Sequence, residues 1–191
     1  MDNYVMEDFE TLSIVLCGIG DPHNLGSILR SAYFCGVDKV YTVNCTFEGI
    51  KNEPFLKSTA PLSPVVSKSS SGVLELFQPV HINDSIEFIR TMQSKGCTIV
   101  GSGIKSESIQ DVQSYDSKSK ENENETKKRH LLIIGNEGFG IPNYLSKMCD
   151  KWIYLQPGRD LDSDVDSLNV SVATALLINS MKNLKINSNL Q

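Results

Sequence analysis

The sequence predicts an α/β protein in which helices flank a mostly parallel sheet, and three observations support this prediction. Short apolar runs alternate with stretches whose apolar residues recur at helical spacing, a pattern typical of parallel strands joined by helices. Glycine or polar residues follow several of the apolar runs, as expected where strands end. The chain has 191 residues, of which 40% are hydrophobic, so we expect a single domain over residues 1–191 with one sizeable core.

In the first half of the chain, a buried strand is predicted at Leu12–Cys17, because this run is almost entirely apolar. A helix follows, whose apolar stripe stops at Gly36 and comprises Leu25, Ile28, Leu29, Ala32 and Cys35. Lys39–Val43 is predicted as the second strand. Residues 58–76 are rich in serine and proline, and we expect them to be the least regular ordered stretch.

The second half repeats the alternation. A helix is predicted over Ser85–Met92, and strands are predicted at Thr98–Val100, Leu131–Ile134 and Trp152–Leu155. The last helix has an apolar face formed by Ala173, Leu176, Leu177, Met181 and Leu184. Residues 114–129 lack apolar periodicity and are predicted as a mobile surface loop, and residues 185–191 as a frayed polar tail. The core is therefore expected to span about residues 12–184.

Composition excludes several classes of protein. No run approaches the ~18 apolar residues of a membrane span. Five widely spaced cysteines without a C-x-x-C motif indicate a reducing compartment and no disulfide framework. The three histidines are scattered, and the acidic run 160–166 lacks the glycine and the terminal glutamate of a calcium loop, so no metal site is expected. That run is predicted as a solvated loop.

The charge of the chain bears on nucleic acid as a partner. The formal net charge is −5 and the pI is about 5.2, which argues against binding nucleic acid through overall charge. Much of this acidity lies at 121–125 and 160–166, so the balance does not exclude RNA. Residues 1–12 are acidic and contain no apolar h-region, so no targeting segment is visible. A chain that is a fragment, cut at a domain boundary, would begin in the same way.

Three segments that follow predicted strands are candidates for chemistry. In the first, Asp21-Pro22 gives a sharp turn, Asn24 precedes the helical stripe, and Arg30 lies on the helix face opposite that stripe. Asn24 can cap the helix or bind a ligand. The alternative for this segment is a simple cap followed by a solvated arginine.

The second segment runs from Leu131 to Pro142 and places Gly135, Gly138 and Gly140 around Glu137. Its order is neither that of the dinucleotide fingerprint nor that of a P-loop. An ordinary tight connection to a helix that begins near Pro142 is the alternative. A carboxylate in a glycine-rich turn at a strand end is nevertheless a poor choice for packing alone.

The third segment, 167–171, places hydroxyl and amide side chains at the start of the last helix, from Ser167 and Asn169 among others. Free N–H groups at a helix start favour an anion. A plain N-cap is the alternative.

Together, three motifs in this order resemble those of the SpoU/TrmH family, the RNA ribose 2′-O-methyltransferases of the SPOUT superfamily. The motifs are N-L-G-x-x-x-R at 24–30, I-G-N-E-G-x-G at 134–140 and S-L-N-V-S-V-A-T-A at 167–175. Residues 65–68 with Ser71-Gly72 also resemble the family's segment between its second and third strands. Residues 21–40 are most similar to the mitochondrial large-subunit rRNA guanosine methyltransferases, especially those of fungi.

The resemblance implies a C-terminal trefoil knot, a feature otherwise nearly absent from proteins. It also implies a homodimer, S-adenosylmethionine as the cofactor and no metal. The pocket for S-adenosylmethionine would be formed by residues of three strand ends and the last motif, namely Ser102, Gly103, Gly135, Asn136, Gly138, Gln156 and Leu168. The family usually has an Ile-Pro-Met-like segment where this chain has Leu155-Gln156-Pro157-Gly158.

The same resemblance implies roles for the polar motif residues. Arg30 would act on the ribose 2′-hydroxyl, although a guanidinium is a poor base because it stays protonated. It would instead stabilise developing negative charge and bind phosphate. Asn24, Ser167 and Asn169 would position Arg30 and the ribose, and Glu137 would hold Arg30 or neighbouring backbone.

The expected function is therefore methyl transfer to a ribose of RNA, most simply a guanosine of mitochondrial large-subunit rRNA, in the mitochondrial matrix. A tRNA-directed enzyme of the same family and a non-catalytic RNA-binding or ribosome-assembly module are the alternatives. Related mitochondrial enzymes carry an N-terminal RNA-binding domain that the sequence does not contain. We therefore expect the chain alone to bind RNA weakly.

Overall fold

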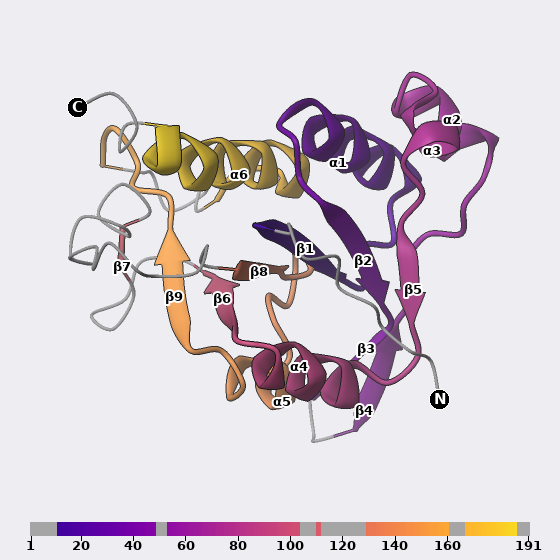
Figure 1. Ribbon diagram of the computed structural model, residues 1–191. Coiled ribbons are helices and arrows are strands. Elements are labelled where there is room, and N and C mark those ends of the chain that lie inside the picture. The colour runs from indigo at the N-terminus through magenta and orange to yellow at the C-terminus, as the bar shows by residue number, and fades with distance from the viewer. Residues whose placement is uncertain (1–10, 49–52, 104–109, 112–128, 161–166, 187–191) are drawn as a thin grey trace.

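The structure is a computed structural model that describes residues 11–48, 53–103, 110–111, 129–160 and 167–186 (Figure 1). Its described strands form a seven-stranded sheet of order β5-β2-β1-β8-β6-β9-β7 and a separate two-stranded sheet, β3-β4. All described pairings in the larger sheet are parallel, whereas β3 and β4 are antiparallel. The strands are β1 (Leu12–Cys17), β2 (Lys39–Val43), β3 (Cys45–Glu48), β4 (Pro54–Lys57), β5 (Val80–Ile82), β6 (Cys97–Ser102), β7 (Gln110–Asp111), β8 (Arg129–Ile134) and β9 (Lys151–Tyr154).

Helices cover both faces of the larger sheet, so the predicted α/β class is confirmed. Figure 1 shows α1 and α6 side by side on one face, and α4 with α5 on the other. The helices are α1 (Pro22–Phe34), α2 (Pro64–Ser69), α3 (Val73–Leu76), α4 (Ser85–Ser94), α5 (Asn143–Ser146) and α6 (Val170–Ile186). No helix among the described residues is long and apolar enough to cross a membrane.

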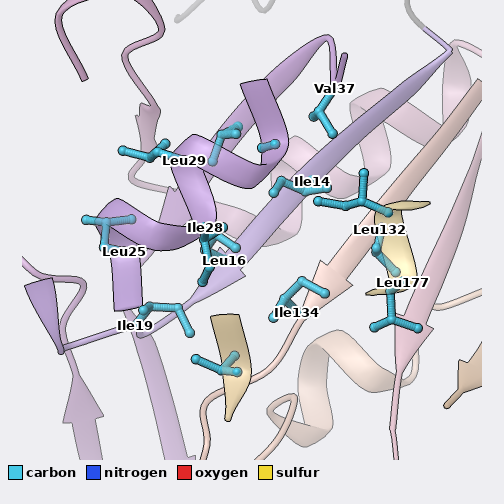
Figure 2. Close-up of a cluster of buried hydrophobic side chains, with 14 of the residues drawn as sticks. Ile14, Leu16, Ile19, Leu25, Ile28, Leu29, Val37, Leu132, Ile134 and Leu177 are labelled. Atoms are coloured by element: carbon cyan, nitrogen blue, oxygen red, sulfur yellow. The ribbon is translucent and has the colours of Figure 1, made fainter. Parts of the chain in front are cut away.

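The alternation of side chains along β1 divides the core into two clusters. Ile14 and Leu16 point to the face covered by α1 and α6, where they pack with Leu25, Ile28 and Leu177 (Figure 2). Val15 and Cys17 belong to the cluster under α4. Successive strand residues point to opposite faces, so a strand with no exposed position is buried on both sides, as the parallel arrangement requires.

Helix α1 connects β1 to β2 and carries two of the candidate residues. The Asp21 carboxylate accepts the backbone N–H of His23 at 2.9 Å, and Asp21 is the N-cap. Asn24 lies inside the first turn and is buried, so the possibility that Asn24 caps this helix is wrong. Cys35 is the C-cap of the helix, and Gly36 takes φ 69°, a left-handed conformation that favours glycine.

Most element boundaries agree with the sequence predictions to within two residues, and several regions differ. Residues 58–76 contain two short helices, α2 and α3, because Pro64 begins the first and Gly72 precedes the second. The hairpin β3-β4 and the short strands β5 and β7 were not predicted from the sequence, because none forms a long apolar run. Helix α6 continues to Ile186, two residues into the tail predicted at 185–191, and the rest of that tail lies outside the described residues.

Some predictions fall outside the described residues. The loop predicted at 114–129 lies there except for Arg129, which begins β8. The acidic run is described only at Asp160, which is exposed. The trefoil knot that the family resemblance implies is not tested by the described residues and stays a prediction.

Candidate functional site

The candidate site lies where the carboxyl ends of β1 and β8 meet. These two strands are neighbours in the sheet, with Leu16 paired to Ile134. The chain leaves β1 toward α1 on one face and leaves β8 toward α5 on the other (Figure 1). Adjacent parallel strands whose connections diverge in this way open a crevice, which is the usual ligand position in such sheets. The first two candidate segments follow these two strands.

Glu137 receives three hydrogen bonds through a single carboxylate oxygen, Oε1. The donors are the side-chain amide of Asn24 at 2.9 Å, the side-chain amide of Asn169 at 3.1 Å and the backbone N–H of Val170 at 3.2 Å. Val170 is the first residue of α6, so the carboxylate also lies at the positive end of that helix's dipole. Glu137 therefore holds the backbone at the start of α6, which is one of the two roles expected for it.

Asn169 caps the start of α6 and links this helix to α1. Its Oδ1 accepts the backbone N–H of Ser171 at 2.9 Å, which makes it the N-cap. Its Nδ2 donates to Asn24 Oδ1 at 3.1 Å as well as to Glu137. Asn24, Glu137 and Asn169 therefore form a closed ring of hydrogen bonds across 113 and 145 residues of sequence.

Arg30 lies apart from this ring. It is six residues further along α1 than Asn24, about 9 Å along the helix axis, and it is exposed. Its Nη1 donates to Ser71 Oγ at 2.9 Å. Ser71 joins α2 to α3 and has φ 55°, an uncommon conformation for a residue other than glycine. The structure thus gives Arg30 a partner that the sequence did not indicate.

The glycine-rich turn after β8 is closed by its own backbone. The N–H and C=O groups of Asn136 and Gly140 exchange two hydrogen bonds, each of 2.8 Å. The side chain of Asn136 donates to the Gly18 carbonyl at 2.8 Å and accepts the N–H of Gly138 at 3.0 Å. Asn136 therefore ties the turn to the end of β1, and Glu137 follows it within the turn.

The remaining candidate residues lie at the neighbouring strand ends or at the start of α6. Ser102, the last residue of β6, donates to the Ile133 carbonyl at 2.9 Å, and the N–H of Gly103 donates to the Ile153 carbonyl at 3.0 Å. These two hydrogen bonds tie the end of β6 to β8 and to β9. Gln156 follows β9 and is exposed, and Ser167 and Leu168 precede α6, with Ser167 exposed and Leu168 51% exposed.

Two thiols, those of Cys17 and Cys149, have raised pKa values, whereas the hydrogen bond with Cys17 lowers the pKa of Cys45. Cys17 ends β1, and its hydrogen bond with Cys45 together with burial raises the pKa of Cys17 well above its usual value. Burial likewise raises the pKa of Cys149 to about 12 and that of Tyr144 to about 12. Because a thiol reacts as its thiolate, Cys17 and Cys149 are inert packing groups at neutral pH.

Among the described residues, no group of three or more His, Cys, Asp or Glu side chains is arranged to hold a metal ion.

Removing the Glu137 carboxylate is expected to loosen the junction of α1 and α6. Hydrogen bonds to a charged group each contribute about 1.5–3 kcal/mol, less when exposed, so Glu137→Ala should lower the free energy of unfolding by about 2 kcal/mol. Glu137→Gln keeps an acceptor oxygen and should cost about half as much. Urea denaturation measures both values, with the exposed Glu53→Ala as the control. Equal stability of Glu137→Ala and the unchanged chain would contradict a structural role for the ring.

Comparisons with known proteins place the chain among RNA methylases. The model of the SpoU rRNA Methylase family matches residues 11–179. A human protein named "rRNA methyltransferase 1, mitochondrial" is 35% identical over 92% of this chain and 46% of its own length. The protein of the same name from Saccharomyces cerevisiae is 33% identical, over 91% of this chain and 42% of its own length. The "23S rRNA (guanosine-2'-O-)-methyltransferase RlmB" of Vibrio cholerae is 31% identical over 93% of this chain and 61% of its own length.

Solved structures share the fold. The SpoU methyltransferase AviRb from Streptomyces viridochromogenes, in complex with AdoMet, superimposes with a TM-score of 0.72 and 21% identity, over 96% of this chain and 63% of that one. An AdoMet-bound rRNA methyltransferase from Sinorhizobium meliloti superimposes with a TM-score of 0.71 and 23% identity, over 94% of this chain and 59% of that one. The chain thus spans less than two thirds of these relatives, and about half or less of the two mitochondrial ones.

Proposed function

Because the chain belongs to the SpoU rRNA methylase family, we propose that it transfers a methyl group from S-adenosylmethionine to a ribose 2′-hydroxyl of RNA. The observation that supports this best is the hydrogen-bonded ring of Asn24, Glu137 and Asn169. Each residue comes from a different one of the three motifs, and the ring forms at the crevice between β1 and β8. Burying polar side chains costs free energy, so a protein that had kept this fold only for its stability would not need three polar side chains there.

The proposed substrate is a guanosine of mitochondrial large-subunit rRNA. Four similar curated proteins bear the name rRNA methyltransferase 1, mitochondrial, and those named RlmB are guanosine-2′-O-methyltransferases of 23S rRNA. By the same reasoning we propose the mitochondrial matrix as the location. The chain matches only part of each relative's length, so its substrate and its location are proposals.

The residues at the strand ends suit S-adenosylmethionine. Ser102 ends β6, and Gly103, Gly135 and Gln156 follow β6, β8 and β9, with β6 between the other two strands. Leu168 is an apolar side chain with 51% exposure. This set offers backbone N–H and C=O groups and apolar surface rather than metal-binding side chains, which suits an adenine and an amino-acid group. Asn136 and Gly138 would shape the turn that holds Gly135. When bound, S-adenosylmethionine supplies an electrophilic sulfonium methyl group.

Arg30 would act on the ribose oxygen as a permanent cation. A guanidinium stays protonated at physiological pH, so Arg30 would stabilise negative charge that develops on the 2′-oxygen and would bind an adjacent phosphate. Its hydrogen bond to Ser71 holds the side chain outside the core. The ring at the start of α1 fixes the helix that carries Arg30, so Asn24, Glu137 and Asn169 would position it from a distance, with Ser167 beside the ribose.

We also propose that the chain works as a homodimer with a knotted C-terminal segment. Val172 and Leu176 are 47% and 44% exposed on α6. These side chains offer an apolar surface that a second copy can cover. Both features stay predictions.

The proposed activity can be tested with tritiated S-adenosylmethionine. Transcripts of mitochondrial large-subunit rRNA and of tRNA are incubated with the chain, and the modified ribose is then mapped. Label in a 2′-O-methylguanosine of the rRNA is the expected result. Label confined to tRNA would support the tRNA-directed alternative. Absence of both methyl transfer and S-adenosylmethionine binding by calorimetry would support a non-catalytic RNA-binding module and contradict the proposal.

A further inference from the structure

The hairpin β3-β4 builds an aromatic cluster against the glycine-rich turn. Phe47 and Phe55 are a cross-strand pair in the hairpin, with ring centroids 5.9 Å apart. The Phe139 ring lies 5.4 Å from Phe47 and 4.9 Å from Phe55. Exposure increases through the cluster: Phe47 is 6% exposed, Phe55 is half-buried and Phe139 is 49% exposed. Two rings therefore support a third that faces solvent.

A cation accompanies the exposed ring. Lys57 lies two residues after Phe55 and therefore on the same face of β4. Its Nζ is 5.2 Å from the centroid of Phe139 and 5.8 Å from that of Phe55. The base of the side chain also packs closely on Gly18, because a Cβ atom placed on Gly18 would lie 2.9 Å from the Lys57 Cβ. The ammonium is thus held beside the ring and at the end of β1.

This cluster borders the candidate site. Phe139 is two residues from Glu137 in the turn that the Asn136–Gly140 hydrogen bonds close. Asn136 also donates to the carbonyl of Gly18, the residue against which Lys57 packs. The Phe139 ring and the Lys57 ammonium therefore lie at the same carboxyl end of the sheet as the hydrogen-bonded residues Asn24, Glu137 and Asn169.

We propose that Phe139 and Lys57 form a nucleotide-recognition platform, in which the Phe139 ring contacts an RNA base next to the methylated ribose and Lys57 contacts a phosphate. An exposed aromatic ring with an adjacent cation is the combination that binds unpaired nucleotides. In a chain of net charge −5, a cation placed at the site edge favours an anionic partner. This proposal deepens the proposed function and rests on it. Phe139 and Lys57 are specificity-determining residues, distinct from the residues that act on the 2′-hydroxyl.

The test uses a fluorescein-labelled single-stranded RNA of about twelve nucleotides and fluorescence anisotropy at about 50 mM salt, where phosphate contacts are strong. Phe139→Leu keeps an apolar side chain but removes the ring, and we expect it to weaken binding about tenfold. Phe139→Tyr keeps the ring and should bind as the unchanged chain does. Lys57→Gln should reduce the slope of log affinity against log salt by about one. The matched control is Leu56→Ala, an exposed neighbour (61%) on the opposite face of β4.

Three further measurements distinguish contact with RNA from a purely structural role and from contact between two copies of the chain. Calorimetric S-adenosylmethionine binding should be unchanged in Phe139→Leu, and the Tm should fall by only a few degrees, because the ring contacts Phe47 and Phe55. A purely structural role would lower the Tm further and weaken S-adenosylmethionine binding. A Phe139→Leu variant that binds RNA normally would overturn the platform even if methyl transfer occurs, and so would an unchanged chain that binds no RNA. A change in oligomeric state on Phe139→Leu, without a change in RNA affinity, would instead assign this surface to a second copy. Ring-dependent RNA binding without any methyl transfer would keep the platform and contradict the proposed activity.

Discussion

Arg30→Ala is expected to reduce methyl transfer by about 10²–10³-fold, the effect of removing one group that stabilises developing negative charge. The side chain is exposed, and its described hydrogen bond goes to Ser71 Oγ. Its loss should therefore cost little stability, within about 1 kcal/mol. S-adenosylmethionine binding should persist, because Arg30 lies on α1 while the proposed cofactor residues follow β6, β8 and β9. Single-turnover transfer of tritiated methyl groups and calorimetry measure the two quantities separately.

Two further variants sharpen this expectation. Arg30→Lys keeps the charge but loses the planar, two-pronged donor geometry, so its rate should lie between that of Arg30→Ala and that of the unchanged chain. Arg90→Ala is the matched control, because Arg90 is also exposed but belongs to α4 on the other face of the sheet. Arg30→Ala at full activity would exclude a role in the reaction. Equal losses in the Arg30 and Arg90 variants would indicate a general effect of surface charge.

Gly135→Ala is expected to be the most damaging small substitution in the site. A Cβ atom there would lie 2.6 Å from the carbonyl oxygen of Gly140 and 2.7 Å from the N–H nitrogen of Ile141. These are backbone atoms of a turn closed by two hydrogen bonds, so they cannot move aside as a flexible side chain would. We expect a loss of about 3 kcal/mol, which for a chain of this size lowers Tm by about 6–12 °C, together with loss of activity.

Gly138→Ala is the control within the same turn. The nearest atom to a Cβ at Gly138 is Asn136 Oδ1 at 3.8 Å, an ordinary contact, and its φ is not in the left-handed region. This variant should melt within a few degrees of the unchanged chain. Circular dichroism melts distinguish the two glycines. Similar melting of both variants would mean that the turn adapts to a Cβ at Gly135 and that its tight closure is unimportant.

The sequence predicted long apolar elements well and short ones poorly. β1 and β2 have the predicted boundaries because buried parallel strands are continuous apolar runs. The hairpin β3-β4 was missed because its four-residue strands mix polar and aromatic residues and pair only with each other. Their position depends on contacts with the turn after β8, which local sequence does not encode.

The site shows the same division. The motifs identified Asn24, Glu137 and Asn169, but their joining through one carboxylate oxygen depends on sheet order, which places β8 beside β1. Ser71 and Lys57 were not predicted as neighbours of the site. Their relevance comes from a left-handed backbone at Ser71 and from close packing of Lys57 on Gly18. Both are tertiary features, and although Ser71-Gly72 resembles a family segment, nothing in that segment indicated the contact with Arg30.

The place of β8 between β1 and β6 has a consequence during protein synthesis. One edge of β1 pairs with β2, which follows soon after it in the sequence. The other edge pairs with β8, where Leu12 lies opposite His130. The separation in sequence is similar to the 113 residues between Asn24 and Glu137. At 5–20 residues per second, that edge stays unpaired for on the order of ten seconds on the ribosome. An apolar strand with an open edge is prone to pair wrongly. The growing chain is therefore expected to need chaperone protection until β8 emerges.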